Sequence, residues 1–290
     1  MLFKKLALLA LLAFAAGPAA AGDTIAVLSE ASGVYWEAFT AFRTGYGEEI
    51  PYFDISVKKP VIPPGTRTVV TFGSAAAKHA YPPGLQLVYA LAPGYVAAAG
   101  GRTGATVKVS MLAPARRLLT GLKELQPGLK RLLILWRAPG YSAILEDYAA
   151  AGAAIGVKVT LARVKREEQI PGLLRAAIGK ADAFWLPPDP LLFSPSILSI
   201  FREFSLGNAL PMYVSTKGLA QKGACASIGI GFSQIGLAAS DAVMKLRAGA
   251  ALPPIVYPEN AQLTLNASAA KRCNLSFTEA AVAKAEEIFP

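Results

Sequence analysis

The sequence predicts an α/β protein made of two doubly wound parallel-sheet lobes that are joined by a multi-strand hinge. Short apolar runs alternate with amphipathic stretches along the chain, which is typical of βαβ units around a parallel sheet. The alternation occurs as two series of similar size, and 290 residues are enough for two such units. The hydrophobic fraction of 53% is sufficient for two packed cores.

The first residues have the pattern of a secretory signal peptide. Lys4 and Lys5 precede an apolar run at 6–16, and small residues follow at 19–21. The run is shorter than the roughly 20 residues that cross a bilayer. We expect a signal peptide at 1–21, cleaved to release a soluble protein into the periplasm; an uncleaved membrane anchor is the alternative.

The first series supplies one lobe. Strands are expected at 24–28, 53–57, 68–72, 85–90 and 105–109, and helices at 34–45 and 74–80. The first helix carries Trp36, Phe39 and Phe42 on one face, a stripe that indicates core packing. The connection at 58–67 is shorter than the dozen residues that a helical crossover usually needs, so we expect an extended loop there.

The second series supplies the other lobe and, at 235–248, one further helix of the first lobe. Strands are expected at 131–136, 157–162, 183–186, 212–215, 224–230 and 262–265, and helices at 115–125, 142–155, 170–180, 194–206, 235–248 and 278–288. Ser142 and Ser194 are the expected N-caps of their helices. The lobes are expected at 22–113 plus 235–256 and at 114–234 plus 257–290, with hinge segments near 112–114, 231–234 and 257–261.

Composition argues against several classes of site. The net charge of +10 is spread over separate basic pairs without interleaved aromatic residues, so we expect no nucleic-acid partner. A single histidine and two cysteines make a metal site improbable. In an oxidising compartment Cys225 and Cys273 are expected to form a disulfide, and two buried free thiols are the alternative.

An enzyme is disfavoured, and neither a catalytic residue nor a cofactor is expected. His79 is the only histidine, and the chain contains no nucleophile elbow. Glu30 and Asp189 lie at predicted strand ends, but nothing in the sequence fixes their separation for acid–base chemistry. The glycines at 229, 231 and 236 lack the spacing of a dinucleotide-binding loop.

A binding site is better supported, because polar turns follow several predicted strands. Ligands of open α/β sheets lie beyond the carboxyl ends of the strands. In the first lobe, Gly73, Ser74 and Ala75 begin a helix and offer backbone N–H groups to an anion. The remaining candidates are Ser32 in the first lobe and Tyr141, Ser142, Asp189 and Ser194 in the second.

The chain resembles the ABC-transporter solute-binding proteins of the tryptophan/tyrosine-binding type, which have the type 1 periplasmic-binding fold. The resemblance is specific in the C-terminal half and looser before residue 100. It rests on the segments 181–189 (Ala-Asp-Ala-Phe-Trp-Leu-Pro-Pro-Asp), 210–213 (Leu-Pro-Met-Tyr), 246–249 (Leu-Arg-Ala-Gly) and 252–254 (Leu-Pro-Pro). By position it implies an anion turn at Ser74 and Ala75, a second-lobe turn at Tyr141 and Ser142, and an acidic residue at Asp189.

The resemblance implies a protein that closes around a small molecule and delivers it to an ABC permease in the inner membrane, as a monomer. The chain departs from the family pattern at Ala92, where the family has an acidic residue. The ligand is therefore expected to be amino acid-like or more apolar. The alternative function is a periplasmic binding lobe recruited to lipid or cofactor trafficking, or to sensing.

Overall fold

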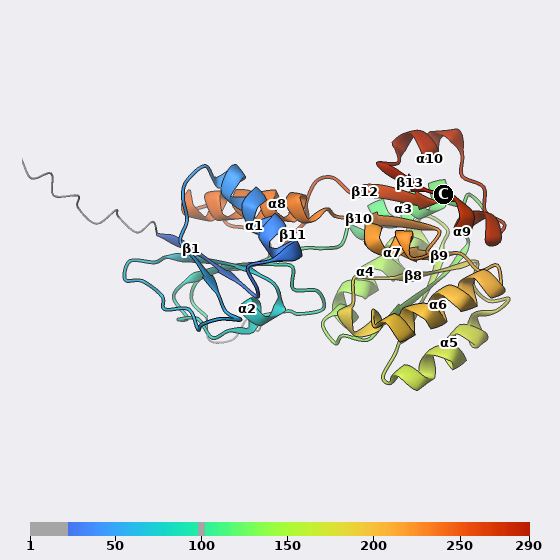
Figure 1. Cartoon of the computed structure of the whole chain (residues 1–290), viewed down its shortest axis with the longest axis horizontal. Coiled ribbons are helices and arrows are strands. Elements are labelled where there is room, and N and C mark those ends of the chain that lie inside the picture. The colour runs from blue at the N-terminus through green and yellow to red at the C-terminus, as the bar shows by residue number, and fades with distance from the viewer. Residues whose placement is uncertain (1–22, 98–101) are drawn as a thin grey trace, which may run out of the picture.

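The computed structural model describes residues 23–97 and 102–290, and the expected signal peptide lies outside them. The chain forms two α/β lobes side by side (Figure 1). We call lobe 1 the six-stranded sheet with its helices, and lobe 2 the seven-stranded sheet with its helices. No helix of the described residues is long and apolar enough to cross a membrane.

Lobe 1 is a parallel sheet in the order β11-β5-β4-β3-β1-β2. Its strands are β1 (Thr24–Leu28), β2 (Tyr52–Asp54), β3 (Thr68–Phe72), β4 (Gln86–Ala90), β5 (Thr106–Val109) and β11 (Ile255–Val256). Its helices are α1 (Gly33–Tyr46), α2 (Ser74–Lys78) and α8 (Phe232–Arg247). The alternation of side chains along each strand explains why both faces of the sheet are buried: α1 and α8 cover one face and α2 the other.

Lobe 2 has the order β13-β12-β10-β9-β8-β6-β7. Its strands are β6 (Arg131–Trp136), β7 (Lys158–Arg163), β8 (Ala183–Leu186), β9 (Met212–Val214), β10 (Ala226–Gly229), β12 (Gln262–Asn266) and β13 (Glu287–Phe289). Its longer helices are α3 (Ala115–Leu125), α4 (Tyr141–Ala154), α5 (Ile170–Ala177) and α6 (Pro195–Gly207). Three short helices complete it: α7 (Lys217–Gln221), α9 (Ala267–Arg272) and α10 (Glu279–Lys284).

The pleat of β6 shows how the two faces of the lobe 2 sheet are filled. Leu132 and Ile134 point into the core under α3 and α4. Leu133 and Leu135 point into the core under α5 and α6. The sheet is therefore doubly wound as expected, although β12 pairs with β10 in the antiparallel sense, so the sheet is not wholly parallel.

The structure corrects several sequence-based expectations. The helix expected at 278–288 ends at Lys284, and the following residues form β13 on the edge of β12. The helix α8 begins at Phe232 and not at 235, so part of the expected hinge at 231–234 is helical. Gly140, and not Ser142, occupies the N-cap of α4. The connection at 58–67 contains no helix, as expected.

Three chain segments pass between the lobes. They connect β5 to α3, β10 to α8 and β11 to β12. The segment between β10 and α8 contains only Ile230 and Gly231, because the strand ends at Gly229 and the helix begins at Phe232. This shortness places the first turn of a lobe 1 helix directly beside the strand ends of lobe 2.

Candidate ligand-binding cleft

A cleft of about 430 Å³ lies between the two lobes, at the carboxyl ends of strands from both sheets. A volume of this size suits a small organic ligand. Lobe 1 contributes the starts of α1 and α2 and the turn after β4, and lobe 2 contributes the turn after β8 and the helix α7. The residues that line it are Val34, Tyr35, Ser74, Leu91, Pro93, Met111, Pro188, Pro190, Phe193, Thr216, Gly218, Leu219, Gln221, Lys222 and Phe232.

The turn after β3 carries the one predicted ligand residue that lines this cleft, Ser74. Gly73 has φ +104°, and a Cβ there would overlap Ser29 and Tyr35, so only glycine fits. The backbone N–H of Ala76 donates to Ser29 Oγ at 3.0 Å. This N–H, which directly follows the expected anion turn at 73–75, is therefore satisfied within lobe 1, while Ser74 stays half-buried at the cleft.

Asp189 is buried and serves the architecture of lobe 2. Its carboxylate accepts N–H bonds from Arg137 at 2.6 Å, Ala138 at 2.7 Å and Leu191 at 3.0 Å. The side chain has no exposed surface and does not line the cleft. This bond network fixes the turns after β6 and β8 and already occupies the carboxylate that was expected to contact a ligand.

Tyr141 strengthens the same pair of turns. Its hydroxyl donates to the carbonyl oxygen of Pro188 at 2.9 Å, and its ring is buried. Burial raises the pKa of the Tyr141 hydroxyl well above its ordinary value, and the charge of Asp189 adds to the effect. Tyr141 therefore remains a neutral hydrogen-bond donor throughout the physiological pH range.

The other predicted site residues lie elsewhere. Ser142 is exposed in the first turn of α4. Ser32 is exposed, and its hydroxyl donates to Glu30 Oε1 at 2.7 Å. Ser194 caps α6, where its Oγ accepts the N–H of Ile197 at 3.3 Å, as the sequence predicted for a helix N-cap. None of these three lines the described cleft.

The sequence interpretation missed the apolar residues that dominate the cleft. The rings of Tyr35, Phe193 and Phe232 contribute to its lining, together with Leu91 and Met111. The helix α7, which carries Thr216 at its N-cap, was not predicted at all. The sequence did contain a signal for Phe193, because this residue closely follows the proline-rich segment 181–189 that carries the family resemblance.

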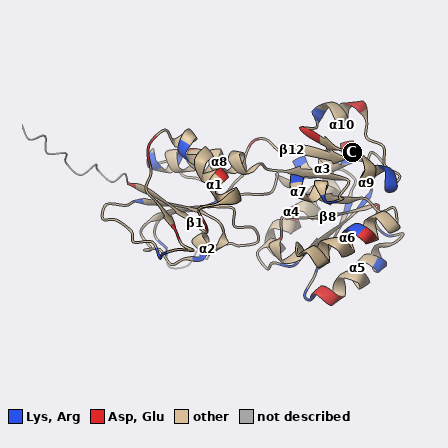
Figure 2. Ribbon diagram, viewed as in Figure 1, with Lys and Arg blue, Asp and Glu red and all other residues tan. Residues whose placement is uncertain are grey.

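The electrostatic character of the cleft is simple. Lys222 is the only charged side chain that lines it among the described residues. Figure 2 shows the basic and acidic residues scattered over both lobes, which agrees with the scattered charge of the sequence. A ligand in this cleft would therefore meet mainly apolar surface and uncharged hydrogen-bonding groups.

The two lobes also touch through backbone at one edge of the cleft. The N–H of Gly140 in lobe 2 donates to the carbonyl oxygen of Gly94 in lobe 1 at 3.1 Å. A Cβ at Gly140 would overlap that carbonyl group, and one at Gly94 would crowd Ala138 and Tyr141. The turn after β6, which Asp189 fixes through Arg137 and Ala138, is thus the turn of lobe 2 that contacts lobe 1.

Lys108 supports the lobe 1 side of this contact. It is buried in β5, and its Nζ donates to the carbonyl oxygen of Tyr95 at 2.7 Å. Burial lowers the pKa of Lys108 to about 8. Tyr95, the residue after Gly94, is therefore held through its carbonyl oxygen by an amine whose pKa lies close to neutral pH.

Comparison with known proteins identifies the family. The family described as ABC transporter substrate binding protein matches residues 107–289, which is more than half of the chain. The chain belongs to this family. It is an ABC transporter substrate-binding protein, whose role is to bind a small solute for an ABC permease, and proteins of this kind act outside the cytoplasm. No curated protein sequence matches the chain.

Solved structures of other proteins show the same fold. An ABC domain from Streptococcus pneumonia in complex with L-Trp is 19% identical with a TM-score of 0.66, covering 92% of this chain and 99% of that one. The ligand-free, open structure of a substrate-binding protein with adhesive properties from Clostridium difficile is 16% identical with a TM-score of 0.61, covering 92% and 99%. A conserved domain protein from Vibrio cholerae is 16% identical with a TM-score of 0.63, covering 91% and 99%.

Proposed function

We propose that this substrate-binding protein captures a predominantly apolar solute, with an aromatic or similar flat group, in the cleft between its lobes. The observation that carries the proposal is the cleft lining. Tyr35, Phe193 and Phe232 line a space that is bounded mainly by aliphatic residues and prolines, with a few polar residues among them. Aromatic side chains with a few polar groups are the usual lining of a site for a flat organic ligand.

The charges argue for a ligand more apolar than a free amino acid. A zwitterion brings an ammonium group, which needs an anionic or strongly accepting partner when it is desolvated. Asp189, the acidic residue expected for that role, is buried behind the turn and already accepts three N–H bonds. Ser74 and Lys222 remain for a hydroxyl, a carbonyl or a weakly acidic group.

We further propose a periplasmic monomer that delivers its solute to an inner-membrane permease by closure of the lobes and that performs no catalysis. The three connecting segments allow hinge closure around a ligand. Under this proposal lobe 1 comprises 22–113 plus 235–256, with its last helix extended back to Phe232, and lobe 2 comprises the rest of the mature chain.

Native mass spectrometry of gently purified protein from the periplasm tests the capture. We expect a bound species that is small, poor in charge and aromatic or aliphatic. Small-angle scattering with and without that species should show a smaller radius of gyration when it is bound. An unchanged radius at saturation would contradict hinge closure, and turnover of the bound species would contradict a purely binding role.

A further inference from the structure

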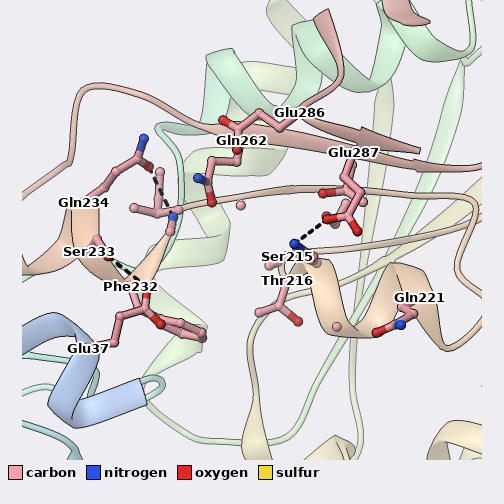
Figure 3. Close-up of a pocket in the computed structure, with 17 residues that line it drawn as sticks. Glu37, Ser215, Thr216, Gln221, Phe232, Ser233, Gln234, Gln262, Glu286 and Glu287 are labelled. Atoms are coloured by element: carbon pink, nitrogen blue, oxygen red, sulfur yellow. Dashed lines mark hydrogen bonds and ion pairs between the residues drawn. The ribbon is translucent and has the colours of Figure 1, made fainter. Parts of the chain in front are cut away.

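A second cavity of about 570 Å³ adjoins the interlobe cleft. The two cavities share Thr216, Gly218, Gln221 and Phe232 among their lining residues, so Phe232 lies where one passes into the other. Figure 3 shows this second cavity between the start of α8, the helix α7 and the strands β12 and β13. We call it the polar compartment.

Paired strands form the floor of the polar compartment. Ser227 of β10 lies opposite Thr264 of β12, and Gly229 lies opposite Gln262. Because side chains alternate along a strand, these four residues face the same side of the sheet. The absence of a side chain at Gly229 keeps the floor open beside Ser215, whose backbone a Cβ at Gly229 would overlap.

The floor presents unused hydrogen-bonding groups. Ser227 and Thr264 are each only 2% exposed, and both line the cavity. Neither hydroxyl has a hydrogen bond to another described residue, in contrast with Ser215, whose Oγ donates to the carbonyl oxygen of Leu186 at 3.1 Å. Both residues line the cavity, and a hydroxyl can donate as well as accept, so each can hydrogen-bond to a molecule that occupies the cavity.

The charged residues of the compartment are at its rim, and three of them have partners there. Lys217 pairs with Glu287, and Glu37 accepts the hydroxyl of Ser233 at 2.9 Å. Glu286 is exposed at the outer edge. Figure 3 shows Gln262 extending from β12 into the space that these rim residues surround. The interior is thus uncharged, with hydroxyl and carboxamide groups that both donate and accept.

We propose that the polar compartment binds a neutral, hydroxyl-rich head group of the same solute whose apolar part occupies the interlobe cleft. The inference rests on the proposed function and specifies its substrate class as an aromatic or apolar group joined to a polyhydroxylated group, as in an aryl glycoside or a nucleoside. Hydroxyls of such a head group donate and accept, which matches Ser227, Thr264 and Gln262.

Calorimetric titration with four probes tests this assignment: phenyl β-D-glucoside, uridine, and the separate parts phenol and glucose. We expect phenyl glucoside or uridine to bind at least ten times more tightly than phenol or glucose. Thr264→Val should weaken binding of the joined probe by about tenfold, the equivalent of one hydrogen bond of roughly 1.4 kcal/mol. It should leave the affinity for phenol unchanged.

A matched control separates the site from general effects of removing a buried hydroxyl. Thr71 in β3 is fully buried, its hydroxyl has no partner among the described residues, and it lines neither cavity. Thr71→Val should leave all affinities unchanged. Gln262 is only half-buried, so Gln262→Leu tests the same compartment with little risk to folding.

Two results would overturn the inference. One is a joined probe that binds no more tightly than its parts, and the other is Thr264→Val and Gln262→Leu weakening phenol and the joined probe equally. Titration with phenol alone separates this failure from failure of the proposed function. Measurable binding of phenol without tighter binding of the joined probes would keep capture of an aromatic solute and remove the head-group assignment.

Discussion

Asp189 shows how a single buried carboxylate at a strand end can hold two turns in place. It accepts N–H bonds from Arg137 and Ala138, which follow β6, and from Leu191, which follows β8. It therefore ties together two turns that come from distant parts of the chain. The sequence alone could not distinguish this role from ligand binding, because a carboxylate at a strand end has the same pattern whether it faces inward or outward.

Asp189→Ala is expected to destabilise the free protein by about 3 kcal/mol, because it leaves buried N–H groups without an acceptor. Chemical denaturation of the ligand-free protein measures this. Asp147 is an exposed aspartate on α4, and Asp147→Ala should leave stability within about 0.5 kcal/mol of the wild type. A variant with unchanged stability but weakened ligand binding would instead place the carboxylate in contact with the ligand.

Lys108 predicts a pH dependence of stability. In the unfolded chain its pKa returns to the ordinary 10.5, whereas burial holds it at about 8 in the folded protein. Between these values the unfolded state binds more protons, so the contribution of Lys108 to stability rises as the pH increases from about 8 to 10.5. The rise should be on the order of 3 kcal/mol.

Denaturation curves at several pH values, compared between the wild type and Lys108→Met, isolate this contribution. The stability difference between the two should grow in favour of the wild type from pH 8 upward. Lys58 is exposed in the loop after β2, and Lys58→Met should show no such trend. Parallel pH profiles for wild type and Lys108→Met would contradict the prediction.

At the scale of elements, Cys225 lies directly before β10 and Cys273 lies directly after α9. In the structure both are buried free thiols and not the expected disulfide. The neighbouring thiol of Cys273, together with burial, raises the pKa of the Cys225 thiol. Cys273 Sγ also lies 3.7 Å from the carbonyl oxygen of Ser205.

We predict that the thiols of Cys225 and Cys273 become a disulfide in the exported protein, because they adjoin each other and the periplasm is oxidising. Titration of the unfolded, unreduced protein should find no free thiol, and reduction should lower stability by roughly 3–4 kcal/mol. Cys273→Ser serves as the reference for the unbonded state. Two titratable thiols in protein taken from the periplasm would exclude the bond.

The elements that the sequence predicted well are those whose signal is local. The strands β1, β3, β6 and β8 have the predicted bounds, because each is a short apolar run between turn residues. The end of the chain was predicted as one helix, yet its last residues pair with the edge of β12. Strand formation there depends on a neighbour that is distant in sequence, which periodicity does not report.

The lining of the cleft also depends on contacts between segments that are distant in sequence. The position of the site beyond the strand ends followed from the fold class, and Ser74 was found in this way. The aromatic lining was missed because Tyr35 and Phe232 lie at helix starts, where an aromatic residue has the same pattern as core packing. Only the three-dimensional meeting of the lobes distinguishes the two roles.

At the scale of the whole molecule, the contact between Gly94 and Gly140 sets how closely the lobes approach at one edge. A side chain at Gly140 would overlap the backbone of Gly94. Gly140→Ala is therefore expected to hold the lobes further apart and to increase the radius of gyration of the free protein. It should also weaken solute binding at least tenfold, because closure would be incomplete.

Small-angle scattering and calorimetry on the same samples measure both effects. Gly172 lies in α5, and a Cβ there would meet no atom within 4 Å. Gly172→Ala is the matched control and should leave shape and affinity unchanged. A Gly140→Ala variant with wild-type scattering and affinity would show that the lobes do not use this contact when they close.

The path of the chain between the lobes also governs the order in which the fold can be completed. The helix α1 packs against α8, about 200 residues later in the sequence, and β5 acquires its edge partner β11 later still. Contacts between segments so far apart form slowly, because the intervening chain must first be brought together. The face of α1 that carries Ala38 and Gly45 meets Gly236 and Leu237 of α8, so it remains uncovered until α8 has been synthesised. The first half of the protein is therefore the part that needs protection from aggregation before the chain is complete.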